Sequence, residues 1–182
     1  DLQKMPLKAK SMMGYLPENP LIYDRLTGAE TLELIGKLRK LSNKLIQQRI
    51  KYYASSLGLG EQIHHEVGTY SKGMKQKLAI AMTLIHDPEI VLLDEPDAHL
   101  NAALQKELVG ALAEMIQSGK KQVLLATHSP ELIRAFDHEM IISVKGQKAK
   151  YLGDSGGIIS VLAGIGSTHS PKLHDLFEHK RL

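Results

Sequence analysis

Two adjacent acidic residues, Asp94 and Glu95, follow a short apolar run and precede Pro96. The run, Glu-Ile-Val-Leu-Leu at 89–93, is apolar on both faces, as expected for a parallel strand buried between helix layers. Ligands of open α/β sheets bind at the carboxyl ends of such strands. In phosphoryl transfer, Asp94 would hold Mg²⁺ directly or through water, and Glu95 would orient or deprotonate the attacking water. The plainer alternative is that this pair ends a strand and begins a turn.

A histidine follows the next apolar run along the chain. Residues 122–126, Gln-Val-Leu-Leu-Ala, repeat the buried-strand pattern, and Thr127, His128 and Ser129 come directly after them. If the two strands are neighbours, His128 lies at the same sheet edge as Glu95. Its imidazole could then donate a hydrogen bond to a γ-phosphate oxygen and report its presence. The alternative is an ordinary loop histidine.

A third segment with chemical potential, Tyr-Ser-Lys-Gly-Met at 70–74, precedes an amphipathic helix. Ser71 is a good N-cap, and Gly73 would let a ligand approach the backbone. The amides of the first turn, together with the helix dipole, form an anion site. A helix start with a few solvated lysines is the alternative.

The first half of the chain is predicted to be helical. Residues 1–12 are rich in lysine and show little periodicity, so they read as a loop or a cut end. Apolar residues at helical spacing predict two helices between residues 27 and 57, and a third over residues 73–86. Gly58 and Gly60 would end the second helix.

The second half alternates strands with helices. Besides the two strands above, the pattern predicts an amphipathic helix over 101–117, a further helix opened by Ser129 and Pro130, and a strand over 140–144. This alternation indicates a layered α/β sheet with right-handed crossovers. The segment from residue 153 onward is rich in Gly, Ser and His, and it fits no element.

Composition narrows the class of protein. The formal charge of +3 comes from 23 basic and 20 acidic residues that are mixed along the chain, which does not by itself favour a nucleic-acid or membrane-surface partner. The absence of cysteine excludes disulfides and thiolate metal sites. Neither a signal-peptide pattern nor a long apolar run is present, so a soluble cytoplasmic protein fits best.

In their order and spacing, these segments resemble the ATPase domain of the ABC superfamily. The stretch 70–74 looks like that family's signature motif in the variant of export-type transporters, although Lys72 and Met74 depart from the commonest Ser-Gly-Gly-Gln form. The family's two domains dimerise head to tail, so the resemblance implies that this motif completes the ATP site of a facing domain. Ser71, Lys72, Gly73 and Met74 would therefore be ATP-binding residues.

The catalytic segments carry the same resemblance. The run 90–93 with Asp94 looks like Walker B, Glu95 like the catalytic glutamate, and His128 like the switch histidine. Upstream, Gly-Tyr-Leu-Pro ending in Glu18 resembles the Q-loop, with glutamate in the place usually given to glutamine. The resemblance implies ATP and Mg²⁺ as cofactors, with Glu18 near both and Asp94 on the metal.

The resemblance covers roughly residues 12–152 and implies an α/β fold. The implied fold is a partial RecA-like P-loop NTPase core. Its sheet would be mostly parallel, and an α-helical subdomain would be inserted into it. The chain, 1–182, would be a single partial ABC ATPase domain. The helical subdomain and signature helix would occupy about 27–88, the core about 89–152, and a tail of unknown structure 153–182.

The Walker A loop is missing from the sequence. A P-loop needs Gly-x4-Gly-Lys-Ser/Thr because its amides and lysine wrap the β- and γ-phosphates, and no such string occurs in the 182 residues. The glycine-rich stretch 164–168 lacks the lysine. In the family this loop lies upstream of the Q-loop, which suggests that the amino-terminal part of the domain is absent from this chain. We therefore expect the isolated chain to have negligible ATPase activity.

Three functional hypotheses remain. The leading one is an incomplete ATP-binding and hydrolysing subunit of an ABC export-type transporter, cytoplasmic and peripheral at the inner face of the cell membrane, docked on a membrane-spanning subunit. The second is a soluble ABC ATPase of DNA repair or chromosome maintenance, favoured by Asp-Ala-His-Leu-Asn at 97–101 and Ala-Thr-His-Ser-Pro-Glu at 126–131. The third is an inactive truncated or chimeric fragment. Nucleic acid is a partner only under the second.

Overall fold

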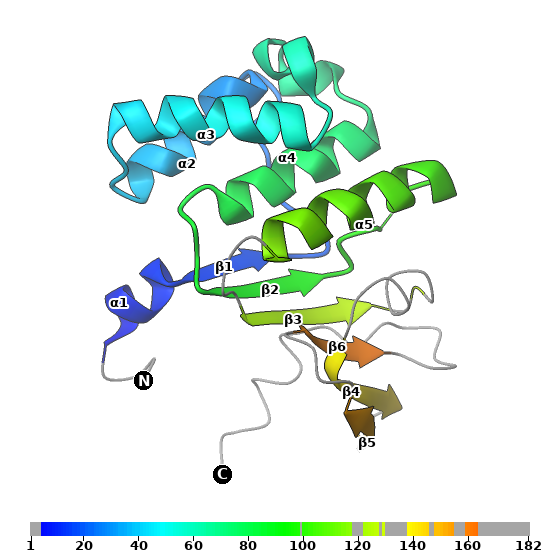
Figure 1. The fold of residues 1–182 in the computed structure, drawn as a ribbon. Coiled ribbons are helices and arrows are strands. Elements are labelled where there is room, and N and C mark those ends of the chain that lie inside the picture. Colours follow the sequence, from blue (N-terminus) through cyan, green and yellow to red (C-terminus); the bar gives the residue numbers. More distant parts are fainter. Residues whose placement is uncertain are drawn as a thin grey trace.

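The computed structural model describes residues 5–98, 100–117, 122–127, 129, 138–145, 148–154 and 159–163. Helices and strands alternate after a helical first half (Figure 1). In chain order the elements are α1 (Pro6–Ser11), β1 (Met13–Leu16), α2 (Gly28–Leu38), α3 (Asn43–Ser56), the 3₁₀ helices η1 (Gly60–His64) and η2 (Val67–Thr69), α4 (Lys72–Leu84), β2 (Ile90–Asp94), α5 (Ala102–Gln117), β3 (Gln122–Thr127), β4 (His138–Lys145), β5 (Lys148–Asp154) and β6 (Ile159–Ala163).

The described strands form one sheet in the order β1-β2-β3-β6-β4-β5. All neighbours are parallel except β4 and β5, which pair antiparallel. The fold is therefore the expected α/β core with a mostly parallel sheet. The segment from residue 153 onward had no predicted element, yet its residues 159–163 form β6, which lies between β3 and β4.

The register brings the ends of three strands to one edge of the sheet. Leu16 of β1 pairs with Leu93 of β2, and Asp94 of β2 pairs with Ala126 of β3. Because these strands are parallel, their carboxyl ends emerge together, with helices on the side of the sheet that Figure 1 shows uppermost. The residues that follow β1, β2 and β3 are thus held near one another by backbone pairing.

The predicted helices of the first half are present. Thr27 caps α2 in a capping box with Glu30, whose carboxylate accepts from the Thr27 backbone N–H over 2.8 Å. Ser42 caps α3, and the chain turns after that helix at Gly58, where φ is +62°. Capping residues begin both helices, and a left-handed glycine follows the second. The ends of these helices could therefore be predicted from residue types.

Residues 1–12 were expected to hold no complete element, and this was wrong for Pro6–Ser11, which form α1. Proline at the first helical position presets the helical φ angle. None of the residues of α1 is buried. The segment therefore has no apolar face at helical spacing from which a helix could be predicted. The Arg39 guanidinium donates to the Lys10 carbonyl over 2.7 Å and ties α1 to the end of α2.

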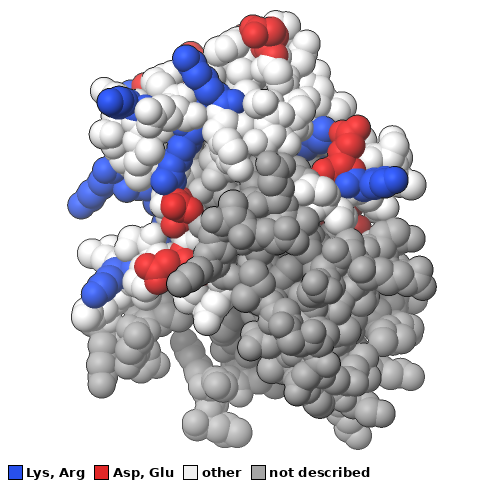
Figure 2. Space-filling view, viewed as in Figure 1, with Lys and Arg blue, Asp and Glu red and all other residues white. Residues whose placement is uncertain are grey.

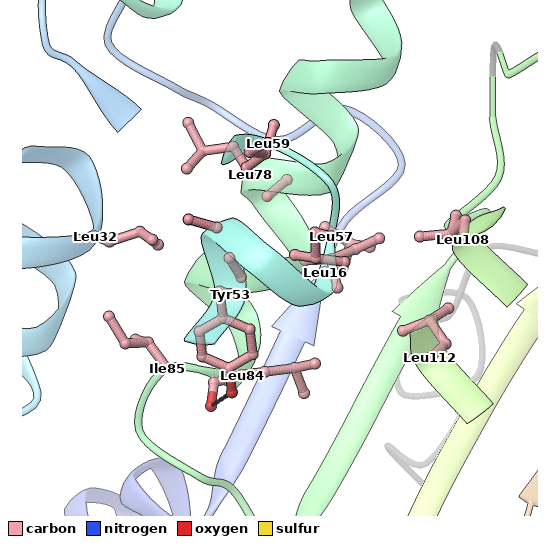
Figure 3. Packing of buried hydrophobic residues seen from close by; sticks show 14 of the residues in the cluster. Leu16, Leu32, Tyr53, Leu57, Leu59, Leu78, Leu84, Ile85, Leu108 and Leu112 are labelled. Carbon is pink, nitrogen blue, oxygen red and sulfur yellow. Dashed lines mark hydrogen bonds between the residues drawn. The ribbon is translucent and has the colours of Figure 1, made fainter. Parts of the chain in front are cut away.

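The core lies between the sheet and the helices of the first half. Helix α4 contacts β1 on one side and α2 on the other. Leu16 of β1, Leu32 of α2 and Leu78 of α4 are each no more than 1% exposed and belong to this core (Figure 3). The Tyr53 hydroxyl of α3 donates to the Leu84 carbonyl over 2.9 Å, so the core also contains an ordered polar contact.

Charges of both signs lie on the described part of the surface in this view. Figure 2 shows lysine and arginine side chains over the helical part, with aspartate and glutamate side chains beside them. In the described part of the chain, no helix has both the length and the apolar character needed to cross a membrane.

Candidate functional site

The turn after β2 holds two buried carboxylates. Asp94 and Glu95 are each 3% exposed. The Glu95 N–H donates to the Ala126 carbonyl over 2.9 Å, which extends the pairing of β2 with β3 by one residue. Glu95 then adopts a positive φ of +46°, a left-handed conformation that is costly for a residue with a side chain. Strained residues of this kind are concentrated at functional sites.

The segment after Glu95 is closed by local hydrogen bonds. The Ala98 N–H donates to the Glu95 carbonyl over 3.0 Å, and the Leu100 N–H donates to the Asp97 carbonyl over 3.2 Å. The Asn101 side chain then accepts from the Leu104 N–H over 3.0 Å and so caps the start of α5. The turn is thus anchored on β3 at one end and on α5 at the other.

Ser71 caps α4 as predicted. Its Oγ accepts from the Met74 N–H over 3.2 Å, and its backbone is extended. Both Ser71 and Lys72 are exposed. Because α4 carries no acidic residue in its first turn, its amino-terminal end keeps the positive character expected of an anion site.

Gly73 packs closely against the start of α5. A Cβ atom at this residue would lie 2.9 Å from the Leu104 side chain and 3.3 Å from the Leu100 side chain. The missing side chain therefore permits close packing of α4 on the start of α5. Met74 is partly buried and packs against the core.

Tyr70 anchors the loop that leads into Ser71. Its ring is 6% exposed, and its hydroxyl donates to the Gln62 carbonyl over 2.5 Å. Burial raises the pKa of the Tyr70 phenol above its ordinary value. The rigid hydroxyl lies so close to Gly28 that a Cβ atom there would meet it at 2.5 Å.

The two other predicted residues are placed less completely. Glu18 is partly buried and follows Pro17 directly after β1, at the edge where Asp94 and Glu95 leave β2. His128 lies outside the described residues. Its neighbours are fixed, however: Thr127 at the end of β3 is fully buried, and its Oγ1 accepts from the Ser129 N–H over 3.0 Å.

The donor chemistry at this edge fits Mg²⁺. Asp94, Glu95 and Glu18 offer carboxylate oxygens, which this hard cation prefers. No cluster of three His, Asp or Glu side chains suited to a metal is found among the described residues. Mg²⁺ in phosphoryl-transfer sites is usually held by one or two carboxylates together with phosphate and water oxygens, a donor set that these residues could supply.

Two further residues belong to the site: Gln76 was not singled out from the sequence, and Asp97 was noted only as part of the segment 97–101. Gln76 is 6% exposed on α4, and its Nε2 donates to the Pro96 carbonyl over 2.8 Å. Asp97 is 4% exposed and accepts from Gln105 Nε2 over 3.3 Å. The sequence carried no signal for the burial of Gln76, because position 76 lies about 200° around the helix from both Met74 and Leu78 and so falls outside their apolar stripe.

Residues 20–134 match the family model described as "AAA domain, putative AbiEii toxin, Type IV TA system". Over 148 residues the chain is 32% identical to the ABC transporter ATP-binding protein NatA of Bacillus subtilis, an alignment that covers 81% of this chain and 60% of NatA. It is 35% identical over 142 residues to the phospholipid-transporting ATPase ABCA7 of Homo sapiens, covering 78% of this chain and 7% of that protein. A similar match, 37% over 134 residues, is made to the retinal-specific phospholipid-transporting ATPase ABCA4 of Bos taurus, covering 74% of this chain and 6% of that protein.

The chain thus spans 60% of NatA and 7% of ABCA7. The mostly parallel sheet covered by helices is consistent with an α/β NTPase core. The chain belongs to the AAA-domain family that its residues 20–134 match, and it is an ABC ATPase domain.

Proposed function

We propose that this chain is the part of an ABC transporter's ATP-binding subunit that carries the signature motif, Walker B and the catalytic glutamate, and that the transporter is of the export type. The observation that carries the proposal is the turn at Asp94 and Glu95. Two carboxylates are buried side by side in sequence at the carboxyl edge of a parallel sheet, and the second is held at a positive φ. A turn that served only to end a strand would gain nothing from this burial and strain.

The proposed roles follow the chemistry of phosphoryl transfer. Mg²⁺ would be held by Asp94 with Glu18 nearby, and the ion would neutralise charge on the β- and γ-phosphates of ATP. Glu95 would orient or deprotonate the attacking water, and His128 would contact the γ-phosphate. What supports the first two roles is the register that brings the ends of β1 and β2 to one edge.

A second domain is needed for the signature motif to act. Ser71 would contact the nucleotide held by a facing domain, together with Lys72, Gly73 and Met74, in a head-to-tail dimer. The exposure of Ser71 and the absence of an acidic residue from the first turn of α4 support this role. A membrane-spanning subunit is proposed as the further partner, because NatA and ABCA7 are named for transport.

The transporter proposal is tested through association that depends on ATP. The chain is mixed with an intact, hydrolysis-deficient ABC ATP-binding domain that contains Walker A, and the apparent Kd is measured with and without MgATP. Ser71→Arg should weaken the ATP-dependent association by roughly 10- to 150-fold, the loss expected for one charge-assisted contact. Ser55→Arg, on an exposed position of α3, adds the same charge and should leave the Kd unchanged.

Equal affinity of the chain and Ser71→Arg, or association that ignores ATP, would contradict the proposal. It would favour the third hypothesis, a fragment that folds without binding nucleotide.

The DNA-repair alternative rests on two sequence segments, Asp-Ala-His-Leu-Asn at 97–101 and Ala-Thr-His-Ser-Pro-Glu at 126–131. Duplex DNA is therefore included in a parallel binding assay. Binding that falls steeply between about 50 and 200 mM salt would support this alternative. Capture of a membrane-embedded partner with no DNA binding would support transport.

A further inference from the structure

A buried hydrogen bond joins α4, the helix that begins at the signature segment, to the turn that contains Glu95. Gln76 Nε2 on α4 donates to the Pro96 carbonyl over 2.8 Å. Pro96 directly follows Glu95, and both Gln76 and Pro96 are buried. The bond spans 20 residues of sequence, so it is a tertiary contact and not part of a local turn.

This bond acts on a turn that needs support. Glu95 is held at φ +46°, and such a conformation persists only where the surroundings determine it. Two backbone bonds contribute, from Glu95 N–H to the Ala126 carbonyl and from Ala98 N–H to the Glu95 carbonyl. Proline has no N–H, so the carbonyl of Pro96 is the backbone hydrogen-bonding group through which this residue can be fixed.

Other residues of α4 contact α5 on either side of Gln76. Gly73 packs against Leu104, and the Lys77 ammonium lies 3.0 Å from the Glu107 carboxylate. The residues flanking Gln76 along α4 thus contact α5, the helix that follows the Glu95 turn. A displacement of the first turn of α4 would therefore be passed to the Glu95 turn through these contacts and through the bond from Gln76 to the Pro96 carbonyl.

We propose that Gln76 is a positioning residue that links the nucleotide contact at Ser71 to the orientation of Glu95. The proposal rests on the proposed function, since it assigns nucleotide contact to Ser71 and catalysis to Glu95. Ser71 caps the helix in which Gln76 lies, five positions later. In a head-to-tail dimer these two residues serve different ATP sites. Gln76 would then couple nucleotide binding at one ATP site to the orientation of the Glu95 carboxylate at the other.

The first test measures whether Gln76 holds the turn. Gln76→Met keeps the length of the side chain but removes the donor, and hydrogen exchange at the Ala98 amide reports the closure of the turn. The protection factor of that amide should fall about 2- to 12-fold, the effect of one lost hydrogen bond. Gln48→Met, at an exposed position of α3, is the matched control and should change nothing.

A second variant separates positioning from packing. Gln76→Glu is nearly the same shape, but its ionised carboxylate cannot donate to the Pro96 carbonyl. Burial raises the pKa of such a carboxyl, and its protonated form can donate again. Protection at Ala98 should therefore be low at about pH 7.5 and recover at about pH 5 in Gln76→Glu, while Gln76→Met shows no recovery. Equal protection in the parent chain and both variants would overturn the proposal.

The third test addresses the link itself. Addition of MgATP and the hydrolysis-deficient partner domain should raise protection at residues 95–98 in the parent chain, and Gln76→Met should lose this rise while still associating. A rise that persists in Gln76→Met would overturn the link. If no association occurs for the parent chain, the proposed function fails and the link with it, whereas a loss of protection in the first test would still show that Gln76 holds the turn.

Discussion

The Lys77 ammonium of α4 lies 3.0 Å from the Glu107 carboxylate of α5, with 9% of the lysine side chain exposed and 63% of the glutamate side chain exposed. The pair is asymmetric: the cation is buried and its partner stands in solvent. Removal of the carboxylate leaves an ammonium that water reaches poorly, so this bridge should matter more than an ordinary surface pair.

We expect Glu107→Gln to lower the free energy of unfolding by about 1–2 kcal/mol, measured by urea denaturation. The control is Glu33→Gln, which removes a solvent-exposed pair with Lys37 on α2 and should cost about 0.3–0.5 kcal/mol. Equal losses in the two variants would show that the burial of Lys77 is unimportant to stability.

Gly73→Ala should destabilise the chain because its Cβ would enter the space of Leu104. The Leu104 atom concerned would lie 2.9 Å away, so the side chain must move or the helices must separate, at a cost of about 1–3 kcal/mol. Thermal unfolding measures the change.

Gly110→Ala, in α5, is the matched control for Gly73→Ala because a Cβ there meets nothing within 4 Å. It should raise stability by about 0.5–1 kcal/mol through helix propensity. Stabilisation by both substitutions would refute the tight packing of α4 on α5.

These contacts separate the features that the sequence predicts from those that depend on tertiary packing. Ser71 was predictable as a cap because its role depends on local residue types. The strand before Asp94 was predictable because a short apolar run admits few structures. The contact of Gly73 with Leu104 was not predictable, because it joins residues 31 positions apart whose pairing depends on how two helices dock.

The same limit explains why the interior strand β6 was not predicted. Residues 158–163 were noticeable only as an apolar stretch, and such a run does not distinguish a strand from a buried helix. Its place between β3 and β4 is set by sheet order, which no local pattern encodes. Gln76 was overlooked for a related reason: its hydrogen-bond partner, the Pro96 carbonyl, is a backbone atom of another element.

His86 should make stability fall in acid. Its Nε2 lies 2.9 Å from the Met13 carbonyl, and burial lowers the pKa of the imidazole, with Arg39 and Arg49 acting in the same direction. Between the lowered pKa and the ordinary value of 6.5, the unfolded chain binds the proton more readily than the folded one. Stability therefore drops as the pH falls through 6.5.

His86→Gln removes the titrating ring but keeps an amide that can donate to Met13, so it should lose this part of the acid sensitivity. Urea unfolding at about pH 7.5 and about pH 5.5 measures the difference. The parent chain should lose more stability than the variant between the two values. An equal loss would show that His86 contributes nothing to the pH dependence.

The isolated chain should hydrolyse ATP negligibly although it contains Asp94 and Glu95. Positioning supplies most of the catalysis in phosphoryl transfer, and no Walker A string in the sequence can fix the phosphates against metal and water. A steady-state assay with MgATP tests this, with Glu95→Gln as the control for contaminating activity. Turnover of about 1 s⁻¹ that disappears in Glu95→Gln would contradict the expectation and reveal a phosphate site elsewhere in the chain. Turnover that persists unchanged in Glu95→Gln would come from a contaminant, since a chain that positions water through this carboxylate must lose activity with it.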